Sequence, residues 1–269
     1  MKDSPYFNAG VVATYDRLVV PLQFAAPARD LVAGLGLSVG SRVLDVGTGT
    51  GAALIRVAAC VGASGVAVGV DASIEMLRAL RQRGAHPVVL AQAPGLPFPE
   101  DHFDAVLASF VLSHFKDYGQ TLADMVRVLR PRGQIGVTAW VAAPNPVAQV
   151  WNNVAAAFVN AEELQAAFRE LIPWDEWFSR PTNLRQALEE AKLVGVDVTR
   201  REYRVTMSVT DYLSVKEASV EGTLLCQRLT TEQRKMFRQR LADVFRSQFG
   251  ETVEYVRDVC FGIGTKPWA

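Results

Sequence analysis

The chain has 269 residues, 49% of them hydrophobic, which is enough for one large domain with a full core. Acidic and basic residues number 28 each, so the net charge of zero provides no global field for nucleic acid or an anionic membrane. The three cysteines lack metal-ligand spacing, no apolar run is long enough to span a membrane, and the first ten residues lack a signal-peptide pattern. We therefore expect a cytoplasmic protein with no metal, membrane or nucleic-acid partner.

The first predicted elements are a strand and a helix joined by glycines. The apolar run 42–46 is typical of a buried parallel strand, and residues 52–60 form a helical pattern. Gly47, Gly49 and Gly51 stand between them, where glycine permits positive φ and lets a ligand approach the main chain. A glycine-rich turn between strand and helix is the general nucleotide-binding crevice of a doubly wound sheet.

Two acids narrow the choice of ligand. The G-x-G-x-G spacing differs from the dinucleotide pattern, and Asp45 at the strand end would repel a pyrophosphate but hold a ligand that carries an ammonium group. S-adenosylmethionine has such an ammonium and no phosphate. Asp71 ends the next apolar run, 66–70, where an acid can accept both ribose hydroxyls, a feature that NAD-binding proteins share.

The rest of the core continues the alternation of strands and helices that is typical of a parallel sheet. Asp117 and Gln120 predict a capping box that begins a helix over 118–129. The other core elements are predicted in this order: strands 87–90, 104–109 and 134–139, helix 183–192, and strands 194–207 and 253–263.

Two further segments do not fit the core plan. Residues 147–171 are apolar at helical spacing, and 211–249 predicts a helical pair whose second member begins at Thr230 or Thr231 with Gln233 as its box partner. Inserted after the fifth and sixth strands, they would cover the carboxyl ends of the sheet, where ligands bind. Their aromatic side chains either line a pocket there or pack on the core.

We thus expect a single domain over 1–269, in which a core is combined with a helical lid. The core is predicted over about 38–140, 182–207 and 251–266, and the lid over about 1–30, 141–181 and 208–250.

Residues 41–140 resemble the Rossmann-like (class I) S-adenosylmethionine-dependent methyltransferases, in particular the small-molecule branch that includes ubiquinone and menaquinone biosynthesis enzymes. The resemblance rests on the glycine loop and on three further motifs in family order, namely Asp71-Ala72-Ser73 with Met76, Leu96-Pro97-Phe98-Pro99 with Phe103-Asp104, and Val128 to Gly133. It implies an α/β fold with a doubly wound, mostly parallel seven-stranded sheet, helices on both faces, an antiparallel strand pair at one edge and helical lid insertions.

The resemblance also implies a set of cofactor contacts for S-adenosylmethionine. They are Asp45, Gly47, Thr48, Gly49 and Gly51 beside the methionine portion, Asp71 on the ribose, Ala72, Met76, Gln92 and Ala93 around the adenine, and Ser109 and Phe110 below the sulfonium. Asp45 is expected to reach the ammonium through water or loop amides. Gln92 and Ala93 replace the usual Asp-Ala, so the Gln92 carbonyl oxygen would accept from the adenine amino group without a charge.

His114 is the candidate catalytic residue, because it follows the fourth strand where donor and acceptor should meet. A histidine titrates near neutral pH and can remove a proton from an acceptor, although positioning alone supplies much of methyl-transfer catalysis. The alternative is a helix-entry residue bonded to the backbone. Tyr15, Trp140 and Trp151 are candidates for the substrate pocket, and such aromatic residues favour an apolar or aromatic acceptor.

The predicted function is methyl transfer from S-adenosylmethionine to a small molecule, with S-adenosylhomocysteine as the product. Transfer to oxygen is slightly preferred, and carbon methylation of a quinone precursor is the alternative within the same class. A fold member that binds the cofactor or a partner protein without catalysis is a third reading, because the loop and the acids explain binding rather than chemistry. The sequence leaves a homodimer open.

Overall fold

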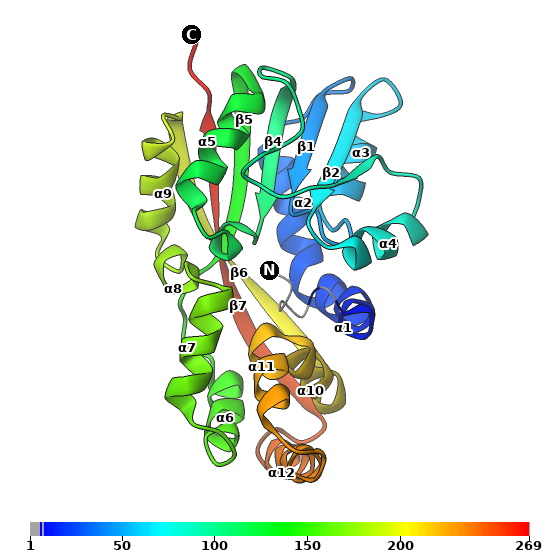
Figure 1. Ribbon diagram of the computed structural model, residues 1–269, viewed down its shortest axis with the longest axis vertical. Helices are drawn as coiled ribbons and strands as arrows, with labels where there is room; N and C mark the ends of the chain where they lie inside the picture. Colours follow the sequence, from blue (N-terminus) through cyan, green and yellow to red (C-terminus); the bar gives the residue numbers. More distant parts are fainter. Residues whose placement is uncertain (1–5, 7, 269) are drawn as a thin grey trace.

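The computed structural model describes Tyr6 and residues 8–268. Its strands form one seven-stranded sheet in the order β3-β2-β1-β4-β5-β7-β6 (Figure 1). The strands are β1 Arg42–Val46, β2 Val66–Asp71, β3 Val88–Leu90, β4 Phe103–Ser109, β5 Leu129–Trp140, β6 Val194–Ser208 and β7 Thr252–Thr265. Strands β1 to β5 pair in parallel, whereas β7 runs antiparallel to both β5 and β6, which stands at the edge. The predicted doubly wound sheet with an antiparallel pair at one edge is confirmed.

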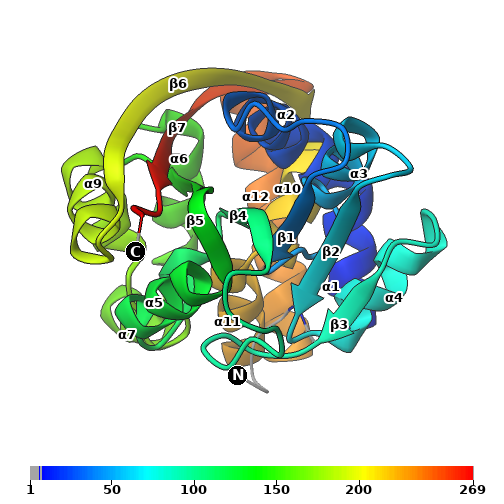
Figure 2. The ribbon, with the colours of Figure 1, turned by 90° about the horizontal axis from the view of Figure 1, so that it is seen from above.

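Helices cover both faces of this sheet (Figure 2). One face packs against α2 (Ala25–Gly34), α3 (Leu54–Val61) and α4 (Ile74–Gln82), and the other against α5 (Tyr118–Val128) and α9 (Pro181–Glu190). Strand β4 divides its side chains accordingly, because Ala105 and Leu107 join the first apolar cluster while Val106 and Ala108 join the second.

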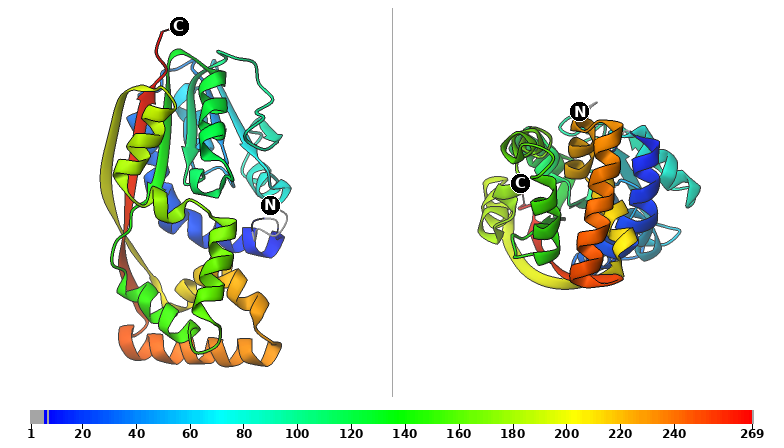
Figure 3. Two further views of the ribbon diagram at one scale, coloured as in Figure 1. Left: turned by 60° about the vertical axis from the view of Figure 1, so that its left-hand side comes forward. Right: turned by 90° about the horizontal axis from the view of Figure 1, so that it is seen from below.

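A second, helical layer lies beyond the carboxyl ends of the parallel strands (Figure 1, Figure 3). Strands β6 and β7 are long enough to run from the sheet layer into this layer, where their ends join a separate apolar cluster. The helices of this layer are α6 Pro146–Ala155, α7 Ala161–Leu171, α10 Val209–Ala218, α11 Val220–Arg228 and α12 Thr231–Phe249. None of the helices in residues 6 and 8–268 combines the length and the apolar composition that crossing a membrane requires.

The region predicted as a helical pair contains three helices. Ser219 adopts an extended conformation between α10 and α11, and its hydroxyl caps α11 by accepting from the Gly222 N–H at 3.1 Å. Helix α12 begins as predicted, with a reciprocal capping box between Thr230 and Gln233. At α5 the Gln120 N–H donates to Asp117, but the Gln120 side chain donates to the same carboxylate rather than to the main chain.

The N-terminal segment connects the two layers. Helix α1 (Ala9–Thr14) continues into a π-helix, η2 (Tyr15–Phe24), and then into α2. Helix α1 contacts both α4 of the sheet layer and α10 of the helical layer, and η2 contacts α10 and β6. π-Helical turns are often found at functional sites, and η2 lies at the boundary where a ligand would enter the sheet crevice. Of the expected lid segment 1–30, residues 1–5 and 7 lie outside the described residues.

Candidate functional site

A cavity of about 870 Å³ lies between the sheet layer and the helical layer. Its walls combine the carboxyl ends of β1, β2 and β4, the helix η2, and side chains of α7, α10 and β7. The volume falls within the roughly 300–1,000 Å³ that is usual for small-molecule sites. The position is also the expected one, since open α/β sheets bind ligands beyond the carboxyl ends of their strands.

Asp71 ends β2 at the wall of the cavity. One carboxylate oxygen accepts the Gly49 N–H at 2.8 Å, and the other accepts the Ser73 N–H at 2.8 Å. Burial raises the pKa of this carboxyl, while backbone donors at Ser73, Gly49 and Ala72 oppose the rise. Each oxygen of a carboxylate has two acceptor positions, so Asp71 can hold the loop and still accept two hydroxyl groups.

The glycine loop serves two purposes. Gly47 (φ +70°) and Gly49 (φ +55°) line the cavity, whereas Gly51 (φ +89°) does not. A Cβ on Gly51 would stand 2.3 Å from Leu80 Cδ1, and one on Gly47 would stand 2.5 Å from a Val111 methyl, but one on Gly49 would meet no atom within 4 Å. Gly47 and Gly51 therefore permit close packing, and Gly49 leaves the space above the loop open.

Asp45 lies beneath the glycine loop rather than at the cavity wall. It is 1% exposed, does not line the cavity, and accepts a hydrogen bond from the Thr48 hydroxyl at 2.7 Å. Burial raises its pKa to about 7, and the Thr48 bond and the charge of Asp71 act in opposite directions on it. Thr48 is also buried and turned away from the cavity. These two side chains fix the shape of the loop from below. The expected contact of Asp45 with an ammonium group, through water or loop amides, stays a prediction.

Ala72, Met76, Gln92 and Ala93 all line the cavity beside Asp71. Ser73 holds this region together, because its hydroxyl accepts the Met76 N–H at 3.2 Å and donates to the Tyr6 carbonyl at 2.5 Å. The structure therefore brings the four residues expected around an adenine to one end of the cavity.

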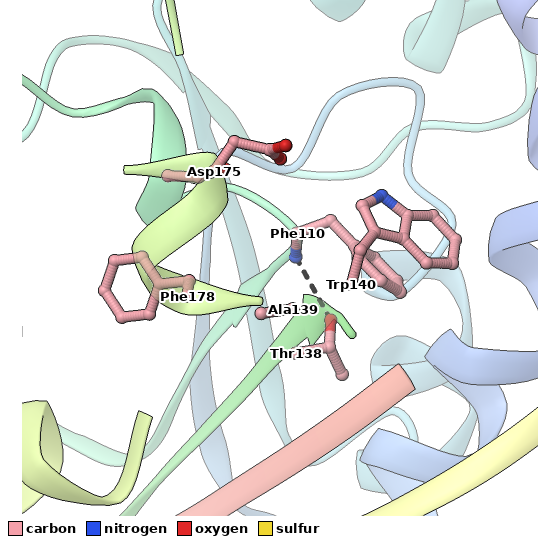
Figure 4. A pocket seen from close by; sticks show the side chains of 7 residues that line it. Phe110, Thr138, Ala139, Trp140, Asp175 and Phe178 are labelled. Carbon is pink, nitrogen blue, oxygen red and sulfur yellow. Dashed lines mark hydrogen bonds between the residues drawn. The ribbon is translucent and has the colours of Figure 1, made fainter. Parts of the chain in front are cut away.

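Ser109 and Phe110 line the cavity at the end of β4. Phe110 has a φ of +56°, an unusual conformation for a large residue, and its N–H donates to Thr138 Oγ1 at 3.1 Å (Figure 4). Its ring stacks on Trp140 with centroids 4.2 Å apart. Such backbone strain is frequent at functional sites.

A small side pocket opens beside Phe110 and Trp140 (Figure 4). Its volume of about 10 Å³ accommodates roughly one water molecule. Asp175, the first residue of the short helix α8 (Asp175–Phe178), points toward the rings of Phe110 and Trp140 in Figure 4. Burial raises the pKa of this carboxyl, Arg257 lowers it and Glu221 raises it.

His114 also lines the cavity, at the end of the short 3₁₀ helix η3 (Leu112–His114). Its ring centroid lies 6.0 Å from that of Tyr6. Burial lowers its pKa to about 4, so the imidazole is neutral at pH 7 and carries one acceptor nitrogen. Tyr15 lines the cavity as well, and burial raises the pKa of its hydroxyl far above the ordinary range.

The expected pocket residues separate into two groups. Trp140 lines the cavity, as Tyr15 does, but Trp151 lies 1% exposed in the apolar cluster of the helical layer. Its ring contacts Phe237 edge to face at 6.1 Å and lies 4.2 Å from the Lys216 ammonium. Trp151 differs from the expectation because the helical layer has a core of its own, which takes the apolar side of α6.

Several cavity residues have no motif in the sequence that marks them. They are Tyr6, Gln23, Asp175, Tyr212, Tyr255 and Arg257. Gln23 donates to the Tyr255 hydroxyl at 3.2 Å, which joins η2 to β7. For Tyr255 and Arg257 the sequence contains one indication, the alternation of faces along β7, which places both side chains on the same side of the strand. In the described part of the chain, no three His, Cys, Asp or Glu side chains group as metal ligands would.

The chain is similar to known methyltransferases in both sequence and fold. A family model for a methyltransferase domain matches residues 44–137. A demethylmenaquinone methyltransferase from Mycobacterium sp. (strain KMS) is 42% identical over 110 residues, which cover 40% of this chain and 46% of that protein. One from Tropheryma whipplei (strain Twist) is 32% identical over 215 residues, covering 77% of this chain and 76% of that protein.

The chain spans about half the length of several curated relatives that it matches, the mycobacterial protein among them. Among solved structures, phosphoethanolamine N-methyltransferase 2 from Haemonchus contortus, in complex with phosphomonomethylethanolamine and S-adenosylhomocysteine, has a TM-score of 0.56 at 14% identity. That similarity, which covers 90% of this chain and 53% of that one, concerns the fold alone. The sequence relatives, the matched domain and the sheet order together show that this chain belongs to the class I S-adenosylmethionine-dependent methyltransferases, in the branch of the ubiquinone and menaquinone biosynthesis enzymes.

Proposed function

We propose that this chain transfers the methyl group of S-adenosylmethionine to a small aromatic acceptor. The observation that carries the proposal is the continuity of the cavity of about 870 Å³. One part of it is lined by the glycine loop and Asp71, and another by aromatic side chains of η2, β5 and α7, namely Phe24, Trp140 and Phe168. A donor and an acceptor bound together in one enclosed space have the arrangement that an in-line transfer requires.

The cofactor end of the cavity fits an adenosine group. Asp71 keeps free acceptor positions for a ribose diol, Gly49 leaves open space above the loop, and the Met76 thioether suits contact with an aromatic ring. S-adenosylmethionine, when bound, supplies an electrophilic methyl group and a good leaving group. The residues of this chain need only hold and orient it and exclude water.

Oxygen is the first candidate for the acceptor atom. A neutral His114 at the cavity wall offers an imidazole nitrogen that can accept a proton from a hydroxyl group. A pKa of about 4 makes this nitrogen a weak base, so its main contribution is to accept a hydrogen bond from the hydroxyl and orient it toward the methyl group.

Carbon is the second candidate, and the names of the relatives favour it. The mycobacterial and Tropheryma proteins are demethylmenaquinone methyltransferases, and other relatives are ubiquinone/menaquinone biosynthesis C-methyltransferases. A quinol ring would fit among the same aromatic side chains, and deprotonation of its hydroxyl would make the ring carbon nucleophilic.

The test combines calorimetry with a transfer assay. Purified protein is titrated with S-adenosylhomocysteine, and then incubated with methyl-labelled S-adenosylmethionine and a panel of phenols, hydroxybenzoates and naphthoquinols. We expect micromolar binding of the cofactor and label in at least one product, whose NMR spectrum assigns the methyl group to oxygen or carbon. Absence of cofactor binding and of labelled product would overturn the proposal and favour a fold member that acts without methyl transfer.

A further inference from the structure

Arg257 is a cation at the cavity wall, and no residue in the described part of the chain forms an ion pair with it. It lies on β7 on the same face as Tyr255, and both line the cavity. Its Nε is buried and has no hydrogen-bond partner among the described residues, and none of the ion pairs found in that part of the chain includes it. Burial lowers the pKa of this guanidinium, while Tyr255, Asp175 and Tyr212 oppose that effect. Guanidinium groups with buried nitrogen atoms are normally paired with an anion, so the half-buried Arg257 side chain suits an anionic ligand.

The guanidinium lies against an aromatic ring. Its central carbon lies 3.7 Å from the centroid of the Trp140 ring, and that ring also stacks on Phe110 with centroids 4.2 Å apart. An arginine stacked on an aromatic face keeps its N–H groups at the edge of the guanidinium plane, where they can form a two-pronged contact with a carboxylate. Trp140 therefore positions Arg257 to bind a planar anion.

The acids near Arg257 among residues 6 and 8–268 do not pair with it. Glu221 is paired with Lys216 at 2.7 Å, and Asp258, the next residue on β7, faces the other side of the strand and pairs with Arg200. Asp175 influences Arg257 through its charge but is not within ion-pair distance.

Arg257 lies beside the expected site of the methyl acceptor rather than beside the expected cofactor site. Phe110 follows Ser109 at the end of β4, next to the expected site of the methyl group, and Arg257 lies one aromatic ring farther along, toward the helical layer. The glycine loop and Asp71 lie on the opposite side of Phe110, on β1 and β2. An aromatic acceptor beside Phe110 and Trp140 would bring a substituent within reach of the guanidinium.

We propose that Arg257 binds the carboxylate of the methyl acceptor, so that the substrate is a small aromatic carboxylic acid. This inference rests on the proposed methyl transfer and narrows its substrate class. Arg257 is a specificity-determining residue in this scheme, and the neutral aromatic walls supply the remaining contacts.

The experiment compares acids with their neutral amides. Calorimetry measures the dissociation constants of 4-hydroxybenzoate and 4-hydroxybenzamide, and of indole-3-acetate and indole-3-acetamide, with and without S-adenosylhomocysteine. In the wild-type protein we expect at least one acid to bind about tenfold or more tightly than its amide, because the amide cannot accept a charge-assisted pair of bonds. Arg257→Gln should bring the ratio of the amide and acid dissociation constants to about one. Arg257→Lys should retain part of the preference for the acid, because it keeps the charge but loses the paired N–H donors of the guanidinium.

Two further variants separate recognition from structure. Arg204→Gln removes the same charge from the neighbouring strand β6, where the side chain is exposed and pairs with Glu254, and it should leave the ratio unchanged. Arg257→Met keeps the length without the charge, so it should abolish the preference for acids while the melting temperature of the ligand-free protein stays equal or rises. A fall in melting temperature with an unchanged ratio would make Arg257 structural.

The remaining outcomes also decide the question. Equal binding of acids and amides to the wild-type protein, or binding of neither, overturns the proposal. If Arg257→Gln weakens S-adenosylhomocysteine but not 5′-methylthioadenosine, which lacks the amino-acid portion, the guanidinium holds the cofactor carboxylate instead. Because cofactor binding is recorded in the same titrations, failure of the proposed methyl transfer is distinguishable from failure of acid recognition.

Discussion

Replacement of Asp71 by Asn tests the cofactor end of the site most directly. The two carboxylate oxygens accept backbone N–H groups of Gly49 and Ser73, each at 2.8 Å, and retain one acceptor position each for a ribose hydroxyl. Asn has nearly the same size but only one acceptor oxygen. Its NH₂ group would either oppose a backbone N–H or donate to a ribose hydroxyl, and the second contact lacks the charge that strengthens a bond to a carboxylate.

The size of the effect follows from the lost hydrogen bonds. A hydrogen bond to a charged group contributes about 1.5–3 kcal/mol, which corresponds to roughly 10- to 150-fold in the dissociation constant. Part of the loss will come from the loop, since Gly49 also loses its acceptor. A change on the ligand side separates the two contributions, because removing the ribose 2′-hydroxyl touches only the contact with Asp71.

The assay is therefore a cycle of two proteins and two ligands. Calorimetry measures how much more weakly the 2′-deoxy analogue binds than S-adenosylhomocysteine itself. We expect its dissociation constant to be about 10- to 150-fold higher in the wild-type protein, and less than about 3-fold higher in Asp71→Asn. Asp101→Asn, which removes an exposed carboxylate that pairs with Lys266, is the control and should behave like the wild type. An equal loss of affinity for the 2′-deoxy analogue in the wild-type protein and in Asp71→Asn would refute the ribose assignment.

Three other predictions concern the loop and the buried ionisable groups. Gly47→Ala should lower stability in urea unfolding by roughly 1–3 kcal/mol more than Gly49→Ala does, because only the Cβ at position 47 would approach Val111 to 2.5 Å. Both positions have positive φ, which strains an alanine to a similar extent. Gly49→Ala, whose Cβ meets no atom within 4 Å, should chiefly weaken S-adenosylhomocysteine binding, and the reverse order would contradict the loop assignment. Asp45 has a pKa of about 7 in the folded protein against 3.8 ordinarily, so the unfolded state loses its proton first as pH rises. Wild-type stability should then fall relative to Asp45→Asn by up to about 4 kcal/mol between pH 4 and 7, and parallel curves would show that Asp45 is ionised. His114, with a pKa lowered from 6.5 to about 4, binds a proton more readily when unfolded, so wild-type stability should fall relative to His114→Gln by at most about 3 kcal/mol as pH decreases from 6.5 to 4. No difference between these two proteins would show that the imidazole is accessible to solvent.

The cofactor half of the site could be predicted because its signals are local. A glycine loop, the strands on either side of it and an acid at the next strand end are short-range features, and they place Gly49 and Asp71 in contact. The orientation of the Asp45 side chain could not be predicted in the same way. Whether an acid at a strand end faces a ligand or the loop depends on its side-chain rotamer and on nearby donors. Here the donor is the hydroxyl of Thr48, three residues along the chain.

The acceptor half could not be predicted because it depends on long-range packing. The apolar positions of α6 have the same spacing whether they line a cavity or a second core, and only the packing of α12 against α6 shows that Trp151 belongs to the core. The helical periodicity of 211–249 likewise gave no sign that Ser219 would divide the first helix in two. For Arg257, strand alternation predicts a face but not that this face meets Trp140.

The two halves of the cavity are joined by a continuous series of contacts through the N-terminal segment. Ser73, at the adenine end, donates to the Tyr6 carbonyl, and Phe24 of η2 contacts both Phe110 and Trp140, with centroids at 5.0 and 5.5 Å. Tyr15 lies between them, 5.7 Å from Tyr6 and 5.5 Å from Phe24. Because one helix supplies walls to both ends, a cofactor that orders η2 would also order the aromatic wall that positions Arg257. Cofactor and acceptor should then strengthen each other's binding by the same factor, since coupling between two sites is reciprocal.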